Sequence, residues 1–140
     1  MKKAALILFF LPLLLVGKVD FVHEVMPVLK KRCAECHAGE KKKGGLSMNT
    51  RSAFLAGGEN GEVAVPGKPK ESYFLDAVTS DDPDERMPPK GDPLTKEQVA
   101  KLTAWVAEGM IWDEGIRLGD SGWEPPLKPR VVSLPKAREG

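Results

Sequence analysis

Cys33-Ala34-Glu35-Cys36-His37 is the most informative stretch of this chain. Two thiols three residues apart, followed at once by an imidazole, are the attachment signature of a c-type haem. On one helical turn the two sulfurs would face the two vinyl groups of one porphyrin edge, and His37 would come round beneath the iron. The motif therefore predicts one haem c held covalently by Cys33 and Cys36, with His37 as the proximal iron ligand.

Two other uses of the cysteine pair fit the sequence less well. A thioredoxin-like dithiol needs a βαβ surround, which the glycine-rich loops and terminal helices predicted here do not provide. A structural zinc site needs four ligands. Cys33, Cys36, His37 and the distant His23 make a poor set, so haem is the favoured interpretation.

Residues 1–17 have the pattern of a signal peptide. Lys2 and Lys3 form a positive n-region, and residues 4–16 form an unbroken apolar run. As a helix this run would span about 20 Å, against the ~30 Å of a bilayer core, so export to the periplasm is favoured over a stable membrane span. Leu-Val-Gly at positions 15–17 lacks the small-x-small cleavage pattern, so the segment could stay as an anchor. Membrane contact is expected only in that case.

Composition restricts the remaining possibilities. The 140 residues suffice for one small domain, and a covalent haem would add a large apolar body to its core. The formal net charge of +1, without a basic stripe, argues against nucleic acid as a partner. Residues 113–140 contain four prolines and little periodicity, which predicts an extended tail after a domain at 18–112.

Helical periodicity appears at both ends of this predicted domain. Asp20 is a plausible N-cap, and the apolar residues that follow it recur at helical spacing, with Pro27 expected to kink the helix or start a fresh turn. Residues 95–98 form a capping box ahead of another apolar stripe, which ends near Gly109. Between these helices, glycine-rich loops and two short helices, near 50–55 and 72–78, are expected.

An electron carrier needs a sixth iron ligand, and Met87 is the best candidate. It stands in Arg86-Met87-Pro88-Pro89, where the prolines keep the backbone extended so that a loop side chain can point inward. Packing on predicted helices explains Met26 and Met110.

Two weaker candidates for this ligand are Met48 and His23. Met48 lies within chain reach of the iron and is a less favoured alternative for the sixth ligand. His23 would lie about 20 Å from His37 along a helix, so a surface or capping role is expected for it.

Taken together, residues 19–112 resemble the planctomycete-type cytochrome c domain, a monohaem class I c-type cytochrome. The motifs that carry the resemblance are Val19-Asp20-Phe21, Val25-x-Pro27-Val28-Leu29, the Cys-x-x-Cys-His pentapeptide, Lys43-Gly44-Gly45-Leu46, Thr50-Arg51, Pro66-Gly67-Lys68, Arg86-Met87-Pro88-Pro89-Lys90, Leu94-Thr95 and Leu102-x-x-Trp105.

This resemblance implies an all-α class I fold, in which the N- and C-terminal helices cross near one haem edge. It makes His37 and Met87 the axial pair. Trp105 and Trp112 would pack beside the haem or at the helix crossing, or serve as ordinary core. Arg51 and Arg86 could pair with haem propionates.

The expected function is that of a periplasmic monohaem cytochrome, an electron carrier rather than an enzyme, which exchanges single electrons with a redox donor and an acceptor protein. Two alternatives stay open. One is a ligand-binding sensor or peroxidase-like module with an open distal site. The other is a docking subunit of a larger redox complex, with the proline-rich tail as part of the docking surface.

Overall fold

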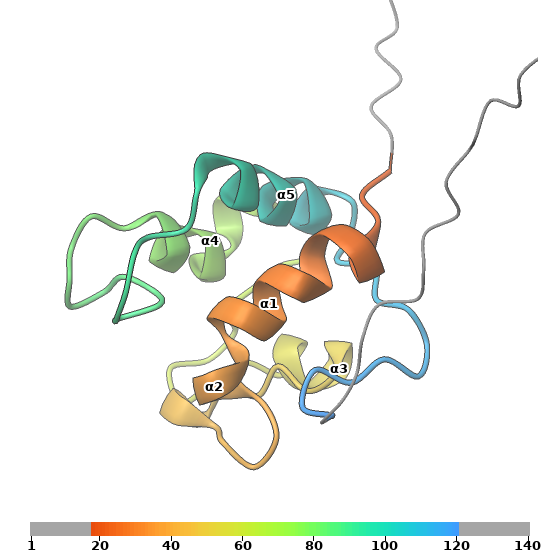
Figure 1. Ribbon diagram of the computed structural model, residues 1–140, viewed down its shortest axis with the longest axis horizontal. Helices are drawn as coiled ribbons and strands as arrows, with labels where there is room; N and C mark the ends of the chain where they lie inside the picture. The colour runs from red at the N-terminus through yellow and green to blue at the C-terminus, as the bar shows by residue number, and fades with distance from the viewer. Residues whose placement is uncertain (1–17, 121–140) are drawn as a thin grey trace, which may run out of the picture.

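The computed structural model describes residues 18–120, and within this range the fold is helical, with no strand (Figure 1). The predicted signal segment and residues 121–140 of the predicted tail lie outside the described range. No helix between residues 18 and 120 combines the length and apolarity needed to cross a membrane. The elements in chain order are η1 (Phe21–Val25), α1 (Met26–Arg32), α2 (Ala34–His37), η2 (Lys43–Gly45), α3 (Arg51–Leu55), η3 (Pro69–Glu71), α4 (Tyr73–Thr79) and α5 (Lys96–Ala107).

The N-terminal helix begins as predicted. The Asp20 carboxylate accepts a hydrogen bond from the His23 backbone N–H at 3.1 Å and contacts the His23 ring at 2.9 Å, so His23 belongs to the cap. One π-helical turn, η1, leads into α1, where Pro27 occupies the first turn. Proline is tolerated there because its missing N–H would have no partner inside the helix.

Helix α5 carries the predicted capping box. Thr95 accepts a hydrogen bond from the Gln98 backbone N–H at 3.2 Å, and the Gln98 side chain accepts one from the Thr95 N–H at 3.0 Å. Leu102, Trp105 and Val106 form its buried face. The chain leaves the helix through Gly109, whose φ of +90° suits glycine.

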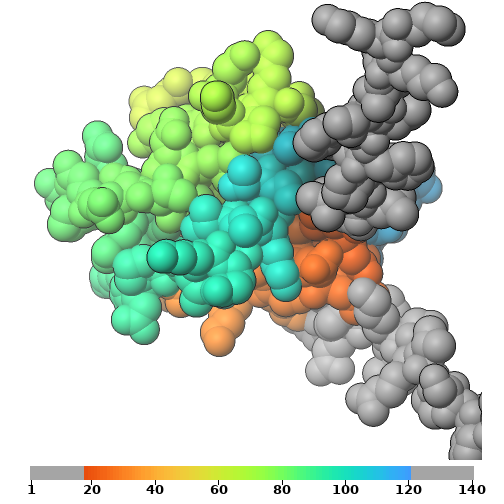
Figure 2. All heavy atoms as spheres, turned by 90° about the horizontal axis from the view of Figure 1, so that it is seen from above, coloured from red at the N-terminus to blue at the C-terminus, as the bar shows by residue number. Residues whose placement is uncertain are grey.

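An aromatic cluster joins η1 to α5. The Phe21 ring centroid lies 5.7 Å from that of Trp105 and 4.5 Å from that of Trp112, and Phe54 of α3 lies 6.1 Å from Trp105. The backbone N–H of Val19 also donates to the Glu108 carboxylate at 2.9 Å. In Figure 2, the surface of α5 lies between the N-terminal helix and the part of the chain from about residue 60 to 90. These contacts bring the two ends of the domain together.

The packed region extends beyond Trp112, where the sequence analysis placed the end of the domain. Ile116 packs against the core and Leu118 is buried. The Leu118 backbone N–H donates to the Asn49 carbonyl at 3.0 Å, and Trp112 donates through its indole N–H to the Ile116 carbonyl at 2.9 Å. The apolar side chains at 116 and 118 are too widely spaced among polar residues to give a periodic signal.

Candidate haem site

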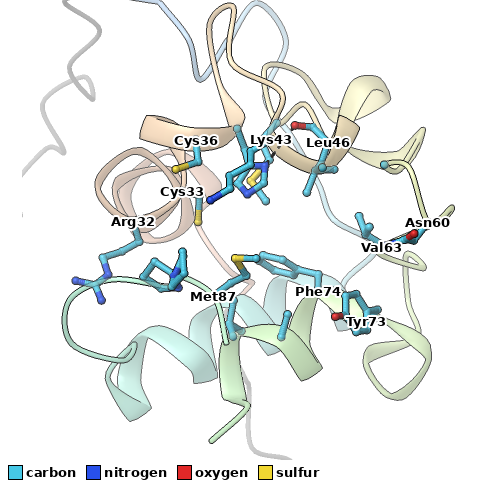
Figure 3. Close-up of a pocket in the computed structure, with 18 of the residues that line it drawn as sticks. Arg32, Cys33, Cys36, Lys43, Leu46, Asn60, Val63, Tyr73, Phe74 and Met87 are labelled. Atoms are coloured by element: carbon cyan, nitrogen blue, oxygen red, sulfur yellow. Dashed lines mark hydrogen bonds between the residues drawn. The ribbon is translucent and has the colours of Figure 1, made fainter. Parts of the chain in front are cut away.

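A cavity of about 590 Å³ lies between α2 and the loop that follows α4. Its volume is in the range of cofactor pockets, and its lining is mostly apolar. Figure 3 shows Cys33 and Cys36 on one side of the space, with Met87 and Phe74 facing them. The residues that line it are Arg32, Cys33, Cys36, His37, Lys43, Gly44, Leu46, Met48, Gly58, Asn60, Gly61, Glu62, Val63, Tyr73, Phe74, Ala77, Val78, Met87, Pro88 and Pro89.

The attachment motif forms a single helical turn. The backbone N–H groups of Cys36 and His37 both donate to the Cys33 carbonyl, at 3.2 and 3.0 Å. Cys33 itself interrupts the helix between α1 and α2, with φ −122° and ψ −33°. Both cysteines are free, and both line the cavity together with His37. The structure therefore brings the predicted attachment residues and the predicted proximal ligand to one wall.

The orientation of His37 is held by neighbouring backbone groups. With its proton on Nδ1, the ring donates to the Leu46 carbonyl at 3.3 Å. The His37 carbonyl accepts a hydrogen bond from the Met48 N–H at 2.7 Å. A hydrogen bond from Nδ1 leaves the Nε2 lone pair free, which is the arrangement of a histidine that binds a metal.

Met87 reaches the cavity from the opposite wall. Its backbone N–H donates to the Ala77 carbonyl of α4 at 2.8 Å, which ties the loop to that helix. The residue is 37% exposed, so it lies at the rim of the cavity rather than in the core. Met87 and His37 thus stand on different walls of the cavity.

The other candidate ligands are placed differently. Met26 and Met110 are buried in the core and do not line the cavity. Met48 is buried and does line it, but its backbone is hydrogen-bonded to His37. Met48 therefore belongs to the His37 wall, whereas Met87 stands on the opposite wall.

The predicted propionate partners do not lie at the cavity. Arg51 donates through Nε and one terminal nitrogen to the carbonyls of Met110 and Gly109, at 2.9 and 3.1 Å, so it caps the end of α5. Arg86 is not among the lining residues. Trp105 and Trp112 belong to the aromatic cluster and not to the cavity wall. The lining cations are Arg32 and Lys43.

The sulfur chemistry of the cavity fits haem attachment better than the alternatives. Desolvation raises the pKa of the Cys33 thiol to about 12; the nearby Arg32 guanidinium opposes this rise and the Cys36 thiol adds to it. A redox-active dithiol needs a lowered thiol pKa, so this environment is unsuited to it. Nor does the described part of the chain gather three or more His, Cys, Asp or Glu side chains into a possible metal site, as structural zinc would require.

Residues 33–91 match the family model described as Planctomycete cytochrome C. The match supports a planctomycete-type cytochrome c domain over this part of the chain. The matched part contains all four residues predicted for the site: Cys33, Cys36, His37 and Met87. No curated protein and no solved structure matches the chain. A cytochrome c domain implies haem as the cofactor and a haem-based redox role.

The structure shows two cavity-lining residues that were not predicted for the site, Phe74 and Arg32, and one residue outside the cavity, Asn49, that supports the segment after His37. Phe74 of α4 lines the cavity, although its sequence pattern indicated only an apolar helix face. Asn49 binds both backbone groups of Gly39, accepting from its N–H at 2.7 Å and donating to its carbonyl at 2.8 Å. No sequence signal marks Asn49. Arg32 does have a sequence signal as a cavity residue, because it directly precedes Cys33 of the haem motif.

Proposed function

We propose that this protein is a periplasmic monohaem c-type cytochrome that carries single electrons between a donor and an acceptor protein. In this proposal Cys33 and Cys36 form the two thioether bonds, and His37 and Met87 are the axial ligands. The N- and C-terminal helices would cross as in class I cytochromes. The observation that supports the proposal best is the convergence of two cysteine sulfurs, an imidazole and a thioether on one apolar cavity.

The chain's own residues would hold the cofactor rather than transform a substrate. Haem supplies the one-electron couple between ferrous and ferric iron. The Leu46 carbonyl orients His37, and the Ala77 carbonyl anchors the backbone of Met87. The apolar side chains of Phe74, Val63 and their neighbours exclude water from the space between. Because both ligands are anchored through fixed backbone contacts, little rearrangement would accompany a change of charge.

The location in the periplasm is supported by the sequence of residues 1–17, with the charged start and apolar run of an export signal. In that oxidising compartment two cysteines three residues apart would form a disulfide unless another group took up the sulfurs, and in this proposal haem attachment does so.

The experiment is a visible spectrum of the haem-loaded ferric protein, with attention to the far-red methionine-to-iron band. Wild type should show the band. Met87→Ala should lose it, keep the haem covalently attached and lower the reduction potential, because a thioether ligand raises that potential. Met48→Ala is the matched control and should keep the band. A band that survives in Met87→Ala would show that another group is the ligand.

The exposure of Met87 favours one second candidate, a ligand-binding haem module whose distal position opens. Carbon monoxide would then bind rapidly to the reduced wild-type protein. The electron-carrier proposal expects slow or weak binding in wild type and fast binding only in Met87→Ala.

A further inference from the structure

The loop between α4 and α5, residues 80–95, carries Met87 but contains no helix of its own. Its first part is ordered by internal hydrogen bonds, in which the Asp82 carbonyl accepts from the backbone N–H groups of Glu85 and Arg86. Met87 is then tied to Ala77 of α4. Pro88 and Pro89 follow, and neither has an N–H to donate. The part of the loop after Met87 therefore depends on contacts of other kinds.

One such contact comes from the opposite wall of the cavity. Arg32, the last residue of α1, donates through its guanidinium to the carbonyl of Asp92, 60 residues further along the chain. The same side chain lines the cavity. In Figure 3, Arg32 extends from the side of the attachment helix toward the loop that follows Met87. The hydrogen bond thus joins the wall of Cys33 to the wall of Met87.

Arg32 is half-buried, and its contact with Asp92 lies at an exposed edge of the cavity. Its Nε is buried and has no hydrogen-bond partner among the described residues. An unpaired buried N–H is unfavourable, and a surface arginine would avoid it by turning its head into water. The side chain instead stays folded over the cavity edge, where its terminal nitrogen reaches Asp92.

We propose that Arg32 is a positioning residue that holds the Met87 loop against the cavity and so controls how readily Met87 yields to an external ligand. The inference rests on the proposed ligation by His37 and Met87. Arg32 directly precedes Cys33, one of the two residues proposed to bind the haem covalently. The hydrogen bond from Arg32 to Asp92 therefore starts beside the attachment point of the cofactor. Loss of this hydrogen bond would raise the fraction of molecules in which the Met87 loop has moved away from the cavity.

The test is a titration of the haem-loaded ferric protein with imidazole, followed by absorbance, in wild type and three variants. Arg32→Met keeps the aliphatic stem and removes the donors, and Arg32→Lys keeps the positive charge. Lys31→Met is the matched control, because Lys31 is the exposed neighbouring cation and does not line the cavity. Apparent affinity for imidazole should rise on the order of tenfold in Arg32→Met. The reason is that apparent affinity increases in proportion to the fraction of molecules whose Met87 loop has moved away from the cavity. Lys31→Met should match wild type.

The charge of Arg32 is a separate variable. If the guanidinium contact matters, Arg32→Lys should also bind imidazole more tightly than wild type. Wild-type affinity in Arg32→Lys would assign the effect to charge and overturn the proposal, as would equal affinities in Arg32→Met and Lys31→Met.

Amide hydrogen exchange of residues 90–95 supplies a readout that does not depend on the iron ligand. Arg32→Met should accelerate exchange in this segment and leave α5 unchanged, whereas a general loss of stability would accelerate both. If wild type lacks the far-red band, the proposed ligation by Met87 fails, and the exchange result alone decides whether Arg32 holds the loop.

Discussion

At the scale of single residues, the site depends on which wall of the cavity each sulfur occupies. Met48 and Met87 both line the cavity, so the side chain type alone does not distinguish them. The backbone does, because Met48 donates to the His37 carbonyl whereas Met87 donates to Ala77 of α4. Two residues with the same side chain are therefore anchored to different walls of the cavity.

A glycine contact sets the separation of two loops at this cavity. Gly44 and Gly58 both line it, and a Cβ on Gly58 would lie 2.5 Å from the Gly44 carbonyl oxygen. Because Gly58→Ala must push the two backbones apart, it should lower the free energy of unfolding of the haem-loaded protein by about 1–3 kcal/mol. Denaturant unfolding measures this, with the exposed Glu59→Ala as control. An unchanged midpoint in Gly58→Ala would mean that the loops are not in close contact.

At the scale of elements, the long helix α5 supports the rest of the domain. It packs against η1 through the aromatic cluster, and Arg51 of α3 binds the carbonyls that follow its last turn. Its start is specified locally, by the reciprocal hydrogen bonds of Thr95 and Gln98. Local capping at one end and tertiary contacts at the other therefore define a helix of twelve residues.

Removal of the N-cap should weaken this helix measurably. Thr95→Ala deletes the hydroxyl that accepts from Gln98 and is expected to lower the free energy of unfolding by about 1 kcal/mol. Lys96→Ala, at the next position, which is also exposed, is the control and should change little. Thermal unfolding of both variants compares them. A loss in Thr95→Ala no larger than in Lys96→Ala would contradict a stabilising role for the cap.

The same hydroxyl affects the titration of Glu97. Hydrogen bonds to the carboxylate, from the Glu97 backbone N–H first and from Thr95 second, lower the pKa of Glu97 in the folded protein. A lowered folded-state pKa contributes stability above the unfolded-state pKa, and this contribution is lost as the pH falls through the folded value. The pKa of Glu97, followed by NMR titration, should therefore rise in Thr95→Ala and stay lowered in Lys96→Ala.

At the scale of the whole molecule, the core and the cavity share one wall, because Met48, Phe74 and Val78 belong to the core and also line the cavity. The core contains the aromatic cluster with Leu29, Leu102 and Met110, and the cavity lies between α2 and the Met87 loop. The segment after Trp112 covers the core on the side of Asn49, since Leu118 is buried and hydrogen-bonded there. Asn49 also binds Gly39, two residues after His37, so this segment is connected to the His37 wall.

Leu118 tests how far the folded domain extends. Leu118→Ala should lower the free energy of unfolding by about 2–5 kcal/mol, because it removes a buried side chain. Ile111→Ala, at a 39% exposed position, should cost clearly less. Denaturant unfolding of the haem-loaded variants gives both values. Equal losses would mean that residues 113–120 do not contribute to the core.

The sequence by itself determined the haem motif, the start of both terminal helices and the family of the domain. The motif and the helix starts depend on residues close together in the chain: Cys33 to His37 on one turn, Asp20 with His23, and Thr95 with Gln98. The family is indicated by several such short motifs along residues 19–112. Only the tertiary structure decided which side chains meet across the cavity. Arg51 reaches Met110 and not the cavity, Arg32 reaches Asp92, and Leu118 reaches Asn49. These contacts join residues about 60 to 70 positions apart, and their partners are backbone carbonyls, which every residue type possesses. A sequence pattern therefore carries no mark of them, and the fold has to bring them together.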